Sequence, residues 1–234
     1  ARADYRQDPK ALVQHIEQRF SYPLVLKPVD DGCSSAVKVI RTLDQLSAYL
    51  EAIFRKEDQP LSEELTHRLS LSPKEEFPAK VQVLVEALIT KKGADRFLEI
   101  TGGLLTHREA DGSIRYEMFE PSEALAGGEV LTLEEKFLAG EGQNLTPARF
   151  TADPKDHEYV SRQVRDTLEQ AARLLGIEGY ARIDAFVRVS ADLQAETIII
   201  EVNSLPGMTP ATAIFHQAAL SGYKPWELID GILG

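Results

Sequence analysis

Cysteine, long apolar runs and basic charge are all scarce in this sequence. Its 234 residues include a single Cys, which excludes an internal disulfide framework and is typical of a reducing compartment. No apolar run approaches the ~18 residues that a membrane-spanning helix needs. The 26 Lys and Arg against 37 Asp and Glu give a net charge of -11. This acidity argues against nucleic acid or an anionic membrane surface as the main partner.

The beginning of the chain, ARADYRQDPK, has neither an initiator Met nor the pattern of a signal peptide. We interpret the chain as an excised piece of a longer protein or as a processed product. Its composition, 43% hydrophobic and 27% charged, is that of a globular chain with room for one large domain or two small ones.

Hydrophobic periodicity divides the chain into helices and strands. Helical spacing and end signals predict helices at 8–20, 42–56, 154–177, 209–223 and 224–233, with Asp8 as an N-cap before Pro9. Branched or alternating apolar runs predict strands at 22–29, 37–42, 81–89, 95–105, 113–124, 181–189 and 196–203. Hairpins separated by helices predict an α+β fold with antiparallel sheets.

Two segments lack a clean period. Residues 57–80 contain three prolines, and we expect a mobile insertion with one helical turn. Residues 127–150 are rich in Gly, Glu and Thr, which is typical of a long functional loop.

Three chargeable or amide groups lie inside the two strands at 181–189 and 196–203, where core strands seldom carry them. If residues 191–194 form the tight connection, Ser190 faces Ala195, and the same register places Asp184 opposite Glu201. Arg182 then faces Asn203, and all four side chains point to one sheet face.

Two carboxylates this close repel each other unless a cation lies between them. Oxygen ligands without His or Cys favour Mg²⁺ or Mn²⁺, and Mg²⁺ in proteins commonly binds phosphates too. The alternative is that Arg182 neutralises Asp184 and Glu201 in a structural ion network. A register slip of one residue would move the side chains to opposite faces and remove the site.

Weaker signals of nucleotide binding lie near the beginning of the chain. Lys27 ends a strand before Pro28, and the DDGCSSA turn that follows offers N–H and hydroxyl donors at Gly32 and Ser34 for phosphate oxygens. Glu86, late in the strand VQVLVEALI, could accept from an adenine amino group. Taken singly, such a Lys or Glu is most often solvated.

The order of the motifs is more specific than any of them alone. PLVLKPVDDGCSSAV, VLVEALI, EEKFLAGEGQNLTPARF, ARIDAF and IIIEVNSLPGMTPAT resemble, in this order, segments of D-alanine–D-alanine ligases of the ATP-grasp superfamily. The resemblance extends from about Tyr22 to the end. It implies an ATP-grasp fold of two α+β subdomains whose antiparallel sheets grip ATP between them. It assigns 1–86 to a partial small subdomain and 87–234 to the C-terminal subdomain, with an active-site loop at about 127–150.

The resemblance also implies a role for individual residues. It places Lys27 at the phosphates, Ser34 in a flap over them, and the adenine hinge at Glu86, Ala87 and Ile89. The ribose carboxylate has no clear match; Asp95 is the nearest candidate and Glu99 the next.

At the chemical centre, the resemblance makes Asp184, Glu201 and Asn203 the Mg²⁺ ligands. Arg182 corresponds to the arginine that stabilises the tetrahedral intermediate, and Gly207 to an N–H donor near the acyl phosphate. The resemblance also makes Lys136, on the mobile loop, a catalytic residue. It implies two substrate positions: Phe137, where the family usually has Tyr, and Thr212, where it has Ser.

The resemblance predicts an ATP-dependent carboxylate–amine ligase that works through an acyl phosphate. We expect ATP and Mg²⁺ or Mn²⁺ as cofactors, D-alanine or a similar small molecule as substrate, and a role in cytoplasmic peptidoglycan synthesis. We expect no nucleic-acid or membrane partner, and a homodimer for the full-length protein. The family's N-terminal substrate domain and a second phosphate-binding lysine are absent, so we expect this chain alone to be inactive. The alternatives are an ATP-grasp ligase for another amino or hydroxy acid, or an ATP-binding module that does not ligate.

Overall fold

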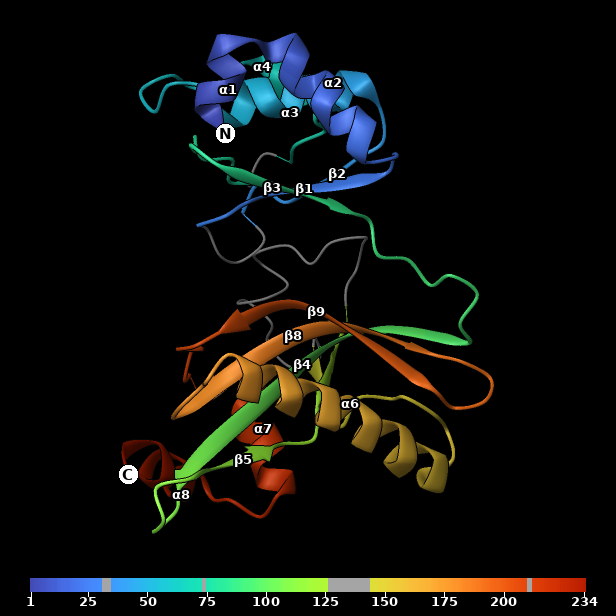
Figure 1. Cartoon of the computed structure of the whole chain (residues 1–234), viewed down its shortest axis with the longest axis vertical. Coiled ribbons are helices and arrows are strands. Elements are labelled where there is room, and N and C mark those ends of the chain that lie inside the picture. Colours follow the sequence, from blue (N-terminus) through green and yellow to red (C-terminus); the bar gives the residue numbers. More distant parts are fainter. Residues whose placement is uncertain (31–34, 73–74, 126–143, 210–211) are drawn as a thin grey trace. The chain divides into compact units, whose positions relative to one another are not determined.

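A computed structural model describes residues 1–30, 35–72, 75–125, 144–209 and 212–234. They form two compact units (Figure 1): unit 1 is Ala1–Ile89, and unit 2 takes the described residues from Thr90 onward. Both units combine helices with antiparallel sheets, so the predicted α+β class is confirmed. In these ranges no helix is both long and apolar enough to cross a membrane. The subdomain bounds 1–86 and 87–234 stay a prediction.

Unit 1 is a three-stranded antiparallel sheet with helices on one face (Figure 1). The strand order is β2–β1–β3, with β1 at Leu24–Pro28, β2 at Lys38–Ile40 and β3 at Val83–Ala87. The helices are α1 (Arg2–Gln7), α2 (Pro9–Arg19), α3 (Leu43–Ile53) and α4 (Glu63–Arg68). Leu24 and Leu26 are fully buried in the core beneath them. Because side chains alternate along a strand, Val25 and Lys27 lie on the opposite face.

Local sequence signals account for the helices of unit 1. The Asp8 carboxylate accepts from the N–H groups of Lys10 and Ala11, so the predicted N-cap of α2 is confirmed. Thr42 caps α3 by accepting from the N–H of Gln45. Helix α4 lies where one helical turn was expected within 57–80, but Leu65, Leu69 and Phe77 of this segment are buried in the core of unit 1, so its described residues pack against the domain and the expected loose insertion is wrong for them. The sequence analysis did not predict α1, a short helix in which no residue is buried.

Unit 2 is built on a six-stranded antiparallel sheet. The order is β7–β6–β4–β8–β9, with β5 also paired to β4. The bounds are Arg96–Arg108 for β4, Ile114–Met118 for β5, Ser122–Ala124 for β6, Asn144–Leu145 for β7, Tyr180–Val189 for β8 and Ala195–Asn203 for β9. The single strand predicted at 113–124 is therefore wrong: it is two short strands, and both pair with β4.

Helices cover both faces of this sheet. They are α6 (Pro154–Leu174), α7 (Ala213–Leu220) and α8 (Pro225–Leu233). Two adjacent glycines of β4 show the two layers, since a Cβ at Gly102 would lie 2.5 Å from Leu168 of α6 and one at Gly103 would lie 2.5 Å from Gln217 of α7. Helix α6 thus packs on one face, and α7 on the other (Figure 1).

The loop predicted at 127–150 is corrected in its last part. Residues 126–143 lie outside the described residues, but 144–150 are packed structure. Strand β7 pairs with β6, and the N–H of Ala148 donates to the carbonyl of Pro121 at 2.8 Å. Ala148 and Phe150 are fully buried in the core under α6. The apolar surface of these two side chains favours packing over the exposed loop that the Gly-rich sequence upstream suggested.

Replacing Leu168 by Ala should destabilise unit 2. Leu168 is fully buried on α6, and large-to-small changes at such sites cost about 2–5 kcal/mol through lost burial and a cavity. Urea unfolding followed by circular dichroism would measure the loss. Leu174→Ala on the same helix is the matched control, since Leu174 is 88% exposed and should change stability by no more than about 0.5 kcal/mol. Equal losses in the two variants would contradict the packing described.

Candidate functional site

The hairpin of β8 and β9 brings the predicted polar side chains together. Asp184 lies opposite Glu201, and Arg182 lies opposite Asn203, as predicted. Their side chains contact one another: one guanidinium nitrogen of Arg182 is 2.9 Å from Asp184 Oδ2 and 3.8 Å from Glu201 Oε1. The facing register is therefore confirmed, and the four residues form one cluster on unit 2.

The predicted turn of this hairpin is wrong by one residue. Ala195 lies opposite Val189, and not opposite Ser190. A β-bulge beyond the facing carboxylates, where Ala185 lies opposite Ile199, takes up one extra residue of β9. The bulge restores the register that the predicted turn assumed. The misplaced turn and the bulge each change the register by one residue, in opposite directions. Asp184 therefore still faces Glu201, and Arg182 still faces Asn203.

Asp184 is the most enclosed of the four residues, at 8% exposed. Its carboxylate accepts from Arg182 Nε at 3.0 Å and from the hydroxyl of Thr101 on β4 at 2.7 Å. Burial raises the pKa of Asp184, the Arg182 guanidinium and the Thr101 hydroxyl lower it, and the Glu201 carboxylate raises it further.

Thr101 is a residue that the sequence analysis missed. It lies opposite Asp184 in the pairing of β4 with β8. Those strands are about 80 residues apart in the chain, as the separation of 83 residues between the bonded side chains shows. The sequence ITGG contains a threonine before two glycines, but this short pattern does not indicate which strand will be its neighbour.

The cluster fits a divalent cation by its donor set. Asn203 Nδ2 lies 3.4 Å from Asp184 Oδ2 and 3.3 Å from Glu201 Oε1, so an amide donor bridges the two carboxylates. A half-turn of that amide would present Oδ1 in its place and complete a set of three oxygen ligands. The described residues include no group of three or more His, Cys, Asp and Glu that could hold a metal, because this set has two carboxylates and an amide.

The ion network that was the alternative reading is also present, since Arg182 pairs with Asp184 in a bidentate contact. The two readings are compatible. A buried carboxylate next to a second carboxylate gains from an added positive charge. The Arg182 side chain is about one-third exposed, so part of it faces solvent while its guanidinium contacts Asp184.

The segment after β9 carries Gly207 and Thr212. Gly207 is exposed, and a Cβ placed on it would lie 3.9 Å from the Thr212 methyl group. Thr212 is the N-cap residue of α7, and its hydroxyl donates to the carbonyl of Thr209 at 2.7 Å. The structure thus places both residues side by side between β9 and α7.

Unit 1 places two predicted nucleotide residues in contact. Lys27 on β1 and Glu86 on β3 form an ion pair of 2.8 Å on the sheet face that lacks helices. The Lys27 side chain is 18% exposed, and the Glu86 side chain is 45% exposed. Ala87 ends β3, and Ile89 follows it as the last residue of unit 1.

The other predicted residues are only partly described. Asp95 precedes β4, and its N–H donates to the carbonyl of Val189 at 2.9 Å. Glu99 lies within β4, opposite Phe186 of β8. Ser34, Lys136 and Phe137 lie outside the described residues.

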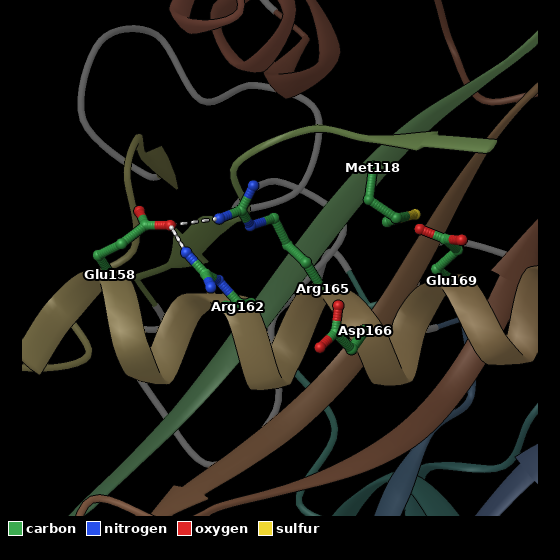
Figure 2. Close-up of a pocket in the computed structure, with 6 residues that line it drawn as sticks. All are labelled: Met118, Glu158, Arg162, Arg165, Asp166 and Glu169. Carbon is green, nitrogen blue, oxygen red and sulfur yellow. Dashed lines mark hydrogen bonds and ion pairs between the residues drawn. The ribbon is translucent and has the colours of Figure 1, made fainter. Parts of the chain in front are cut away.

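A surface hollow of about 340 Å³ on unit 2 is separate from the polar cluster (Figure 2). Its walls come from α6 and β5: Met118, Glu158, Arg162, Arg165, Asp166 and Glu169. Glu158 accepts from both arginines, at 3.5 and 3.2 Å (Figure 2). None of the predicted site residues lines this hollow, and its charged walls carry three carboxylates against two guanidinium groups.

Comparison with known protein families agrees with the order of the motifs. The model described as "D-ala D-ala ligase C-terminus" matches residues 1–72 and 68–234. The two matched segments meet within the predicted insertion at 57–80.

Relatives in other organisms match over nearly the whole chain. The D-alanine–D-alanine ligase of Leptospira interrogans is 26% identical over 98% of this chain and 54% of its own length. That of Geobacter sulfurreducens is 30% identical over 94% of this chain and 55% of its own length. This chain therefore spans about half the length of the relatives it matches.

A solved structure shows the same fold. The D-alanine–D-alanine ligase of Bacillus anthracis complexed with ATP matches with a TM-score of 0.54 and 21% identity, over 93% of this chain and 53% of that chain. The chain has the ATP-grasp fold that the sequence predicted.

Asp184→Asn should change how stability depends on pH. Because burial raises the pKa of Asp184 above its ordinary value of 3.8, the folded state holds this proton more tightly than the unfolded state. The stability that the proton contributes is full below pH 3.8 and is lost as the pH rises through the folded pKa. Asn does not titrate, so the variant should lose less stability than the wild type as the pH rises above 3.8.

Urea unfolding at several pH values would measure this difference. Asp166→Asn is the control, since Asp166 lies exposed on α6. An Asp184→Asn profile parallel to that of the wild type would contradict the assigned burial effect, as would an equal change in the control.

Proposed function

The chain belongs to the D-alanine–D-alanine ligase C-terminal family, and from this premise we propose that it is the ATP-binding and catalytic part of an ATP-dependent carboxylate–amine ligase. The observation that carries the proposal is the facing pair of Asp184 and Glu201, with Arg182 and Asn203 in contact with it. A structural ion pair needs only one carboxylate per cation. The second carboxylate and the amide at the same point add oxygen donors of the kind that bind Mg²⁺, a cation that also binds phosphate.

The reaction that we propose has two steps. A substrate carboxylate oxygen attacks the γ-phosphorus of ATP. The bond between this phosphorus and the oxygen that bridges it to the β-phosphorus breaks, so ADP leaves and an acyl phosphate forms. An amine nitrogen then attacks the acyl carbon, loses a proton, and expels inorganic phosphate as the amide bond forms. Neither step requires a protein nucleophile. The protein's contribution is to place fixed charges and donors where negative charge develops.

In this proposal Arg182 faces the oxyanion of the tetrahedral intermediate, and the N–H of Gly207 donates to the acyl oxygen. Lys136 is the further cation expected at the reacting phosphate. Asp184, Glu201 and Asn203 would hold Mg²⁺ or Mn²⁺, which would neutralise phosphate charge. Arg182 suits its role because its guanidinium already lies beside Asp184 and remains about one-third exposed.

Unit 1 would supply the nucleotide-binding residues. Lys27 would bind phosphate oxygens, and Glu86 with the backbone of Ala87 and Ile89 would read adenine. The 2.8 Å ion pair between Lys27 and Glu86 supports this assignment, because it orients both side chains on the open face of the sheet. Ser34 would cover the phosphates, and Asp95 would contact the ribose, with Glu99 as the alternative.

For the whole protein we propose D-alanine as substrate and D-alanyl-D-alanine as product, made in the cytoplasm for peptidoglycan. The names of the relatives support this substrate. Thr212 would contact the carboxylate of the terminal amino acid. Phe137 lacks the hydroxyl of the family's usual Tyr, which keeps another amino or hydroxy acid as the alternative. A homodimer of the full-length protein is proposed from the family resemblance alone.

Glu201→Gln should weaken the binding of Mg-ATP to this chain by at least about 10-fold, because even residues that only support a metal ligand commonly contribute this much. Isothermal titration calorimetry would measure the affinity. Glu196→Gln is the matched control: Glu196 lies on the same strand but pairs with Arg188 at 2.7 Å, so its loss should leave the affinity within about 2-fold. Failure of the wild-type chain to bind ATP with either Mg²⁺ or Mn²⁺ would count against the proposal.

The full-length protein should release phosphate from ATP when D-alanine is supplied, and this chain alone should not. A coupled phosphate assay with D-alanine, other D- and L-amino acids and D-lactate would identify the substrate. Turnover with a hydroxy acid alone would replace D-alanine in the proposal. Turnover by the isolated chain would show that these 234 residues are sufficient for the reaction.

A further inference from the structure

The buried side-chain amide of Gln217 on α7 forms hydrogen bonds with three groups of the neighbouring strands, two on the backbone and one on a side chain. Gln217 is 1% exposed. Its Oε1 accepts from the N–H of Gly103 at 2.8 Å, and its Nε2 donates to the carbonyl of Thr101 at 2.7 Å and to the Ser122 hydroxyl at 2.9 Å. An amide bonded at both ends inside a core is fixed in a single orientation.

Gly103 allows this close approach. A Cβ at that position would lie 2.5 Å from Gln217 Oε1 and 3.1 Å from Ile214 of the same helix. Any larger residue would therefore push α7 away from β4. The contact between the helix and the strand depends on the glycine, and the hydrogen bond to its N–H follows from the contact.

Thr101 connects Gln217 to Asp184, one of the two facing carboxylates. Its backbone carbonyl accepts from Gln217, while its hydroxyl donates to Asp184 Oδ1 at 2.7 Å. Two hydrogen bonds at one residue thus link α7 to the side chain of Asp184. The same helix begins after Thr212, so the link also reaches the segment that carries Gly207.

We propose that Thr101 and Gln217 are positioning residues that set the affinity of the carboxylate pair for its divalent cation. This inference rests on the proposed function, since it assigns a purpose to contacts with a proposed metal ligand. Thr101 fixes the orientation of the Asp184 carboxylate, and Gln217 fixes Thr101. Partners of this kind commonly change metal affinity by about 10- to 100-fold when they are removed.

A merely structural role would predict a different result. Thr106 lies on the same strand, and both threonines are 8% exposed. Its hydroxyl bonds to the backbone of Gly179, donating to the carbonyl at 3.1 Å and accepting from the N–H at 2.6 Å. Thr106→Val therefore removes a buried hydroxyl without touching Asp184, and it is the matched control.

The experiment measures Mn²⁺ binding to the 234-residue chain by water-proton relaxation enhancement, with and without ATP. Thr101→Val should weaken Mn²⁺ binding by about 10-fold. Thr101→Ser keeps the hydroxyl and should stay within about 2-fold of the wild type, as should Thr106→Val. Circular dichroism checks that each variant is folded, and Glu201→Gln gives the signal of a lost metal ligand.

Gln217→Leu tests the second link. It should weaken Mn²⁺ binding in the wild-type chain but cause no further loss when combined with Thr101→Val, because both changes remove the same support. Multiplying effects in the double variant would overturn the role of Gln217. If Gln217→Leu fails to fold, Gln217→Met, which keeps the length of the side chain but lacks the amide, takes its place in the same comparison.

The possible outcomes distinguish a failure of the positioning role from a failure of the proposed function on which it rests. Wild-type affinity in Thr101→Val, or equal losses in Thr101→Val and Thr106→Val, would overturn the positioning role while leaving the metal site intact. If the wild-type chain binds no Mn²⁺ in either arm, the proposed function falls and the positioning role falls with it.

Discussion

A carboxylate that is removed from water needs a positive partner, and the centre of unit 2 is arranged around one such group, Asp184. Burial raises its pKa, and the neighbouring Glu201 adds repulsion. The Asp184 carboxylate accepts hydrogen bonds from the Arg182 guanidinium, the Thr101 hydroxyl and the Asn203 amide. The three come from different strands of one sheet, so the charge is stabilised only when that sheet has formed.

The two faces of the sheet of unit 2 contribute differently: one carries an apolar core that stabilises the unit, and the other has a hydrogen-bonded contact that positions β4. On one face α6 packs on the larger apolar core of unit 2, where Leu168 lies against Gly102. On the other face α7 lies against Gly103 through a buried amide. Two adjacent glycines let both helices approach the same strand closely. As a result, β4 is fixed from both sides at the point where Thr101 holds Asp184.

Patterns with a short range were predictable, and contacts with a long range were not. The Asp8 cap and the helix predicted at 154–177 depend on neighbours within a few residues, so periodicity and capping chemistry were enough. The turn of the β8–β9 hairpin was misplaced by one residue, and the bulge that compensates depends on packing along both strands. Phe150 was assigned to a loop because the burial of a single aromatic side chain depends on surfaces distant in sequence.

The sequence by itself determined the α+β class and the family, because hydrophobic periodicity and the order of the motifs are properties of the chain alone. Side-chain alternation predicted that Asp184 faces Glu201, but the bulge that preserves this facing belongs to the folded hairpin. Only the tertiary structure decided that Thr101 and Gln217 support that pair. Thr101 lies 83 residues from Asp184, and Gln217 lies 116 residues from Thr101. No local pattern encodes such contacts, because they follow from strand order and from helices packing on opposite faces of one sheet.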